Sequence, residues 1–264
     1  MNKKDKLKAA TFFCSLFLIL GFMLAAYFHF TSVLVNTADD FLQSVESKAT
    51  NAQSIFLSDD FKRHITESSF SKYISATGLN SYVSAQWSSR SIKGNRGSLV
   101  GVITTEYRVL PATISLVKED AQWKIYSLQI RTEQSQQNED IRELPDQQTQ
   151  LLLAKEALST FVTSVQQKSM QPLFNSAAAI WQKNITINKL DAAFERFYSE
   201  DITLLSQINN QQPVFEHVAK LDDEGFMLMA GFYTLEAQKL SFEQRYIYEG
   251  LGWKLVGLDV RLGQ

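Results

Sequence analysis

The stretch Leu116-Val-Lys-Glu-Asp-Ala-Gln-Trp-Lys-Ile125 closes a segment in which apolar and polar residues alternate from Ser81 onward. An alternation with a period of two predicts β-strands, and Glu119-Asp120 is typical of the turn between two of them. The pattern returns near the end of the chain as Tyr248-Glu-Gly-Leu-Gly-Trp-Lys-Leu255. We therefore expect an antiparallel pair of strands at the end of each half of the chain.

Matching residues also recur at a nearly constant distance along the chain. The early matches are 120 positions apart: Phe41-x-x-Ser44-Val45-x-x-Lys48 returns as Phe161-x-x-Ser164-Val165-x-x-Lys168, and Ile65-Thr66 returns as Ile185-Thr186. The late matches are 130 positions apart: Glu119, Trp123-Lys124 and Leu128 return as Glu249, Trp253-Lys254 and Leu258. An offset that grows in this way predicts a duplicated domain with one loop insertion. Half of the matched residues are apolar, and the matched Ser, Thr and Lys fit helix faces and caps, so the repeat specifies a core and not a chemistry.

The hydrophobic period predicts helices followed by strands in both halves. In the first half we expect a helix over 38–49 with Thr37 as its cap, a short helix after Ser58 and a third helix from Thr66 to Gly78, then strands near 81–92, 98–109, 112–118 and 122–131. In the second half we expect helices over 147–168, 172–183 and 187–198, then strands near 213–221, 226–235, 239–249 and 252–262. Residues 131–146 hold almost nothing to bury, so we interpret them as a linker.

This order predicts an α+β protein with two tandem domains, over residues 37–130 and 147–264. Each domain would pack its helices on one face of a curved antiparallel sheet. The length of 264 residues suits two domains of about 100 residues each. The hydrophobic fraction of 45% is typical of a globular protein, and the net charge of −2 gives no general attraction to nucleic acid.

The ending at 116–125, preceded by Phe41 to Lys48 and by Phe61-Lys62, resembles the nuclear-transport-factor-2-like superfamily, also called cystatin-like or ketosteroid-isomerase-like. The ending at 248–255 is similar to the same pattern. The resemblance covers roughly residues 38–130 and 147–262, and it implies a helical layer followed by a strongly curved sheet that forms a cone. It implies little about function, because this superfamily hosts enzymes, binding proteins and scaffolds.

The N-terminal sequence predicts a transmembrane helix that serves as an anchor. Ala9 to Phe30 is an apolar run without a formal charge, and about 20 such residues can cross a bilayer as a helix. Four lysines lie within residues 1–8, whereas residues 31–47 contain no Lys or Arg. This asymmetry predicts a cytoplasmic tail over 1–8 and places the rest of the chain outside. A cleaved signal peptide is the alternative, although apolar residues continue to Val35.

The cysteine count indicates the compartment. Cys14 is the only cysteine, so the portion after residue 30 can form neither an intrachain disulfide nor a thiolate metal site. Exported domains without disulfides are common in bacteria. We therefore expect a location in the inner (cytoplasmic) membrane, with both domains in the periplasm or outside the cell. The expected partners are the membrane, through residues 9–30, and envelope proteins or a second copy of the chain.

No set of residues points to a particular reaction. The histidines His29, His64 and His217 are scattered without His-x-x-x-His spacing, and no serine lies in a Gly-x-Ser-x-Gly setting. We therefore predict no metal, no cofactor and no catalytic residue. His217 is the candidate polar site residue; its neighbour Glu216 would point to the opposite face of the same strand, so the two could not act together.

Five aromatic residues are candidates for lining a cone-shaped pocket, although aromatic side chains at such positions also form ordinary core. These candidates are Trp87, Tyr107, Tyr233, Tyr246 and Trp253.

Three hypotheses about function stay open at this point. The first is a membrane-anchored binding or assembly module that acts through protein–protein contacts in the cell envelope. The second is a small-molecule enzyme or ligand carrier that uses one cone as its pocket. The third is that the second domain binds while the first only spaces it from the membrane. A deep cavity with a desolvated carboxylate or His217 would favour the enzyme, whereas a cone filled by its own side chains would argue against it.

Overall fold

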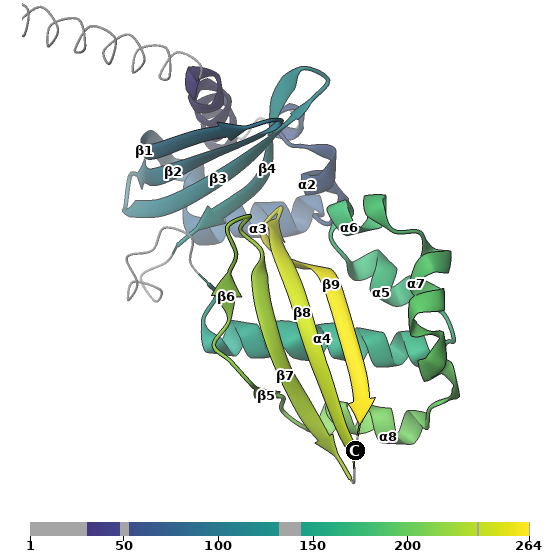
Figure 1. The fold of residues 1–264 in the computed structure, drawn as a ribbon. Helices are drawn as coiled ribbons and strands as arrows, with labels where there is room; N and C mark the ends of the chain where they lie inside the picture. The colour runs from purple at the N-terminus through teal and green to yellow at the C-terminus, as the bar shows by residue number, and fades with distance from the viewer. Residues whose placement is uncertain (1–30, 48–52, 132–143, 237, 264) are drawn as a thin grey trace, which may run out of the picture. The chain divides into compact units, whose positions relative to one another are not determined.

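The computed structural model describes residues 31–47, 53–131, 144–236 and 238–263 (Figure 1). The chain divides into two compact units. The first unit contains residues up to Ser58 together with Ile74–Tyr126, and the second contains Asp59–Tyr73 together with residues from Ser127 onward. Both units are α+β, with antiparallel sheets, as the order of elements in the sequence predicts.

The first unit pairs a helix with a four-stranded sheet. The described part of the helix covers residues 31–46. The sheet has the order β1-β2-β3-β4, formed by β1 (Tyr82–Lys93), β2 (Arg96–Thr105), β3 (Val109–Glu119) and β4 (Gln122–Ile130). The last residues of β4, from Ser127 onward, belong to the second unit. Two short 3-10 turns also belong to this unit: η1 (Gln53–Ile55) follows the helix, and η2 (Leu79–Ser81) directly precedes β1. Phe41 and Leu42 of the helix, and Leu99 and Ile114 of the sheet, are fully buried and form the centre of the core.

The second unit begins with two helices from the first half of the sequence, α2 (Asp59–Arg63) and α3 (Glu67–Thr77). The last turn of α3, from Ile74 onward, belongs to the first unit. This assignment differs from the boundaries expected at 37–130 and 147–264, and contacts within the unit explain it. The Tyr73 hydroxyl donates to the carbonyl of Leu128 and accepts the N–H of Ile130. Leu128 donates its N–H to the carbonyl of Gly250, at the tip of the second sheet.

The remaining helices of the second unit pack on its sheet. They are α4 (Gln147–Gln166), α5 (Gln171–Ser176), α6 (Ala179–Asn184), α7 (Ile187–Phe194), η4 (Glu195–Ser199), α8 (Ile202–Ser206) and η5 (Gln207–Asn210). The sheet has the order β5-β7-β8-β9, with β6 also paired to β7; its strands are β5 (Val214–Phe215), β6 (Lys220–Leu221), β7 (Met227–Leu235), β8 (Gln238–Glu249) and β9 (Gly252–Gly263). In Figure 1 the long helix α4 crosses behind the strands.

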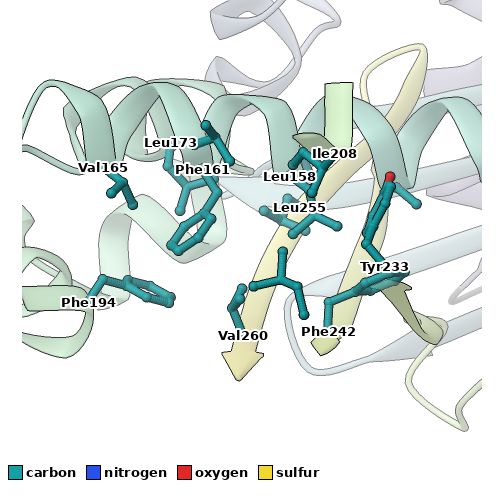
Figure 2. Close-up of a cluster of buried hydrophobic side chains, with 14 of the residues drawn as sticks. Leu158, Phe161, Val165, Leu173, Phe194, Ile208, Tyr233, Phe242, Leu255 and Val260 are labelled. Carbon is teal, nitrogen blue, oxygen red and sulfur yellow. The ribbon is translucent and has the colours of Figure 1, made fainter. Parts of the chain in front are cut away.

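The core of the second unit lies between α4 and one face of this sheet, here called the inner face (Figure 2). Side chains alternate along β7 and β8, so that Met229, Tyr233 and Phe242 are buried against the helices. The Phe161 ring of α4 meets Phe194 and Phe197 edge-on, with centroids 5.3 and 5.1 Å away. Burial of this cluster is the main source of stability for the unit.

The repeated residues take similar local roles. Phe41 and Phe161 are both fully buried on their helices. Thr66 accepts the backbone N–H of Ser69 at the start of α3, and Thr186 accepts that of Lys189 at the start of α7. The duplication of a whole domain stays a prediction.

The structure corrects the predicted fold in its N-terminal part. In the described portion of the chain, no helix is long and apolar enough to cross a membrane, so the predicted fold class with a transmembrane helix is wrong for these residues. The predicted anchor itself, residues 9–30, and the tail over 1–8 lie outside the described residues. Thr37 is also not a helix cap: it lies inside the helix, and its hydroxyl donates to the carbonyl of Val33 one turn earlier.

Two predicted elements of the second half are interrupted. The single helix expected over 172–183 breaks into α5 and α6, because Ala177 and Ala178 are extended and the Ala178 N–H donates to Leu255 of β9. The single strand expected over 213–221 is reduced to the short strands β5 and β6. The helices α8 and η5 lie in a stretch for which the sequence predicted no element.

Candidate functional site

The outer face of the second sheet, opposite α4, carries a hollow of about 430 Å³. Its floor contains the outward side chains of β7 and the bare backbone of Gly257 on β9, and its walls come from the 217–220 segment and from β8. We call it the outer-face hollow; its main residues are His217, Val218, Lys220, Leu228, Ala230 and Arg245. The register aligns Leu228 with Arg245 and Arg245 with Gly257. Because Gly257 has no side chain, nothing within the described residues covers the outer face of the sheet beside Arg245 at that position.

The wall formed by the 217–220 segment exists because the edge strand is interrupted. β5 and β6 each pair with β7, and the residues between them leave the sheet. Ala219 is buried in the core of the unit, whereas its neighbour Val218 is 82% exposed. Leu228, which also lines the hollow, is 43% exposed. Together Val218 and Leu228 form a small exposed apolar patch at the rim of the hollow.

Most charges around the outer-face hollow are already paired. Arg245 binds the carboxylates of Asp222 and Glu224 and stacks on the Phe226 ring, 4.1 Å from its centroid. Arg261 binds Asp259 at 2.9 Å.

Two further pairs complete this set, because Arg261 also lies 3.7 Å from Glu243 and Lys239 lies 3.1 Å from Glu216. Lys220, in contrast, has no ion pair within the described part of the chain. The hollow therefore offers an apolar floor and one unpaired cation.

His217, the candidate polar residue from the sequence, lies on the wall of the outer-face hollow with its side chain exposed. Glu216 next to it forms the ion pair with Lys239. His217 therefore borders the outer-face hollow, and the surrounding groups do not form a buried acid–base pair with it.

The five aromatic candidates do not share one pocket. Tyr107 is 81% exposed in the turn between β2 and β3, and Trp87 is buried in β1; both belong to the first unit. In the second unit, Tyr233 and Tyr246 are buried on the inner face, and Trp253 packs edge-on against Tyr248.

Tyr233 and Tyr246 are core residues. The Tyr246 hydroxyl donates to the carbonyl of Leu153 on α4, and burial raises its pKa well above the usual value. Burial also raises the pKa of Tyr233 to about 12. A phenol held in its neutral form by burial is a poor general base at neutral pH. The inner face is thus occupied by packed side chains in the described part of this unit.

A buried histidine–carboxylate pair escaped the sequence analysis. Glu249, at the end of β8, is 1% exposed, and both of its oxygens accept the N–H of Ala179 at 3.1 Å. It therefore caps α6 from a distant strand. Nε2 of His64 lies 3.3 Å from the same carboxylate. Beside this pair, Lys183 binds the buried Asp60 at 2.7 Å.

Burial lowers the pKa of His64, and the nearby cations Lys254 and Arg63 lower it further, while Asp60 opposes them. Although the Glu249 carboxylate lies 3.3 Å away, Nε2 of His64 makes no hydrogen bond within the described residues. The lowered pKa favours the neutral form of His64 at neutral pH. The only hint in the sequence was Glu249 itself, which the repeat aligns with Glu119.

We expect the His64 pair to make the second unit sensitive to acid. The unfolded chain binds a proton near pH 6.5, whereas folded His64 binds it only at a lower pH, so stability falls as the pH drops below 6.5. The substitution His64→Gln should reduce this loss of stability below pH 6.5, because glutamine cannot be protonated. Urea denaturation at pH 7.5 and 5.5 measures the difference. Equal slopes in the two proteins would show that His64 is not desolvated.

The described residues contain no group of three or more His, Cys, Asp or Glu side chains that could hold a metal ion. The outer-face hollow also lacks a nucleophile paired with a base. The hollow thus presents an apolar surface with one cation unpaired within the described residues, Lys220, beside it.

The comparisons with known proteins are sparse. No family model matches the sequence, and no curated protein matches it. Among solved structures, a cystatin-like protein from Ruminococcus gnavus ATCC 29149 is similar over 92% of this chain and 96% of its own, with 9% sequence identity and a TM-score of 0.29. A TM-score this low establishes neither fold nor function. The resemblance to the cone-like superfamily therefore stays a prediction, whereas the α+β class rests on the structure itself.

Proposed function

We propose that this protein is a binding or assembly module that recognises another protein through the outer-face hollow of its second unit. The observation that carries the proposal is the combination of an apolar floor and rim with the unpaired ammonium of Lys220. The occupant is a protein segment that inserts an apolar side chain beside Val218 and Leu228 and places a carboxylate near Lys220.

Energetics support this kind of occupant. Burying one aliphatic side chain in a hollow stabilises a complex by about 1.5–3 kcal/mol. An ion pair with Lys220 adds specificity and on-rate, since the neighbouring cations already have partners. The paired charges form a polar rim of the type that surrounds protein interfaces.

The alternative of an enzyme or carrier needs a hollow cone. In the described second unit the inner face holds Phe161, Phe194, Phe242 and their neighbours, and Figure 2 shows these side chains filling the space between α4 and the strands. This packing favours surface recognition over enclosure of a small molecule.

The proposal can be tested by site-specific photo-crosslinking in the full chain. A photoreactive amino acid at Val218 should capture a partner that the same amino acid at Leu152, an exposed apolar position on α4, does not capture. The mapped crosslink should fall in a segment with an apolar residue next to an acidic one. Capture of a second copy of the chain would identify the module as self-assembling.

Charge reversal supplies a quantitative measure with the captured partner. Lys220→Glu should weaken binding by about tenfold or more, because it replaces an attraction with a repulsion. Lys189→Glu on the exposed side of α7 makes the same change of charge away from the hollow and should leave the Kd unchanged. Equal affinities for both variants, measured by calorimetry, would contradict the proposed site.

A further inference from the structure

The first unit carries a separate, larger groove of about 810 Å³ between its helix and the strand β1. The helix contributes Asp39, Gln43 and Glu46, and β1 contributes Tyr82, Val83 and Ala85. We call it the β1 groove. None of its lining residues belongs to the site proposed above, and all of them belong to the first unit.

The β1 groove follows the edge of the sheet. β1 is a terminal strand, and among the described strands its one neighbour is β2. Residues 82–85 all line the groove, although consecutive side chains of a strand point to opposite faces. A hollow that touches four such residues in a row must reach the strand's edge, where backbone groups face outward.

The same strand contains a regular stretch next to this opening. The register with β2 shifts between Tyr82 and Ser84 and again between Trp87 and Ser89. These bulges limit the length of edge that another strand could use. Between them, Ser84 to Trp87 pair without interruption with Thr104 to Gly101. A short extended segment could therefore add here, and a long one could not.

The walls of the β1 groove are acidic. Asp39 and Glu46 lie on one side of the helix, and no Lys or Arg is among the lining residues. Asp39 is half-buried, and its Oδ1 atom has no hydrogen-bond partner within the described residues. The indole nitrogen of Trp87 is also buried, and it lies close to this carboxylate, as does the hydroxyl of Tyr82.

The surroundings of Asp39 are unfavourable to its charge. Desolvation raises the pKa of the carboxyl, and Asp40 adds to the effect; Trp87, Tyr82 and Arg90 act in the opposite direction but do not cancel it. A cation that entered the groove would relieve this cost, because an opposite charge stabilises a desolvated carboxylate.

From the strand edge and the acidic walls together, we infer that the β1 groove binds a short extended segment of a partner protein that carries basic side chains. The segment adds to β1 alongside Ser84 to Trp87 through backbone hydrogen bonds, and its Lys or Arg side chains pair with both Asp39 and Glu46. The inference does not depend on the function proposed for the second unit.

Three synthetic peptides test the inference on the full chain. The first is a capped Lys-Val-Lys-Val-Lys-Val peptide, the second has Glu in place of Lys, and the third is the Lys peptide with alternate backbone nitrogens methylated. The Lys peptide should bind and slow hydrogen exchange in residues 82–93. The Glu peptide should fail for lack of charge complementarity, and the methylated peptide should fail because it cannot pair with a strand edge.

Variants of the groove locate the binding. Asp39→Asn and Glu46→Gln should each lower the affinity for the Lys peptide by about tenfold, since each removes one charge-assisted contact. Asp120→Asn, in the β3–β4 turn, removes the same charge outside the groove and should have no effect. Glu46 is exposed, so its variant remains informative if Asp39→Asn disturbs the fold.

The inference is overturned if the Lys and Glu peptides bind equally, if methylation has no effect, or if the protected amides lie outside β1. Failure of the peptide to bind in this way would not contradict the proposed site around Lys220. That site lies in the second unit and is tested by reversing a positive charge, whereas the β1 groove lies in the first unit and is acidic.

Discussion

Replacing Phe161→Ala should lower the free energy of unfolding of the second unit by about 3–5 kcal/mol. Phe161 has no exposed surface, and its ring makes edge-to-face contacts with Phe194 and Phe197. Alanine would remove these contacts and leave a cavity between α4 and the helices that follow it. Relaxation cannot fill such a cavity completely, because the surrounding side chains are held by strands on the other side.

Denaturation with urea, followed by far-UV circular dichroism, measures the effect of Phe161→Ala. Leu152→Ala is the matched control on the same helix: Leu152 is 56% exposed, and its truncation should change the stability by no more than about 0.5 kcal/mol. A loss below about 1 kcal/mol for Phe161→Ala would mean that the cluster in Figure 2 does not hold the unit together.

In the first unit, the largest loss is expected from Gly101→Ala. A Cβ atom at Gly101 would lie 1.9 Å from the carbonyl oxygen of Gln86 and 2.8 Å from Cα of Trp87. Both atoms belong to the backbone of β1, so no side-chain rotation can make room. The strands β1 and β2 must separate at the point where the register shifts, at a cost of about 1–3 kcal/mol or more.

Hydrogen exchange resolved by segment measures this effect best, because it separates the two units. Residues 82–105 should exchange faster in Gly101→Ala, while β7 to β9 keep their protection. Gly252→Ala is the control, since a Cβ atom there meets nothing within 4 Å. Unchanged protection in β1 would show that the two strands do not approach each other so closely.

The strands were the most predictable part of the fold. The expected strand over 122–131 corresponds to β4, and that over 252–262 corresponds to β9. Both rest on local signals: the period of two, and turn residues such as Asp120 and Gly250, which have a positive φ. The N-cap of α4 is a local contact as well, because the carboxylate of Asp146 accepts the N–H of Thr149 at 2.7 Å.

The interruptions could not be predicted, because distant residues cause them. No Gly or Pro marks the break between α5 and α6; the Ala178 N–H finds its acceptor on β9, at Leu255. Threonine is a common residue at helix N-caps, but Thr37 lies within the helix over 31–46. A local pattern shows what a residue can do, and tertiary contacts decide which of its options it takes.

The candidate sites divide in the same way. The type of residue at His217 was visible in the sequence, but its place on the wall of a hollow depends on the interrupted edge between β5 and β6. Asp39 and Glu46 looked like ordinary residues of an amphipathic helix. Their role as the acidic wall of a groove follows from the position of β1 next to that helix.

By itself, the sequence determined that this chain has two sets of helices followed by antiparallel strands, and which apolar residues, such as Phe41 and Phe161, lie inside. Those properties follow from periodicity and residue volume, which act over a few neighbouring positions. Only the tertiary structure decided that α2 joins the second unit, that Glu249 caps a helix far away, and where the surface is hollow. Such features depend on the register between strands and on packing between segments distant in sequence, and no local pattern encodes them.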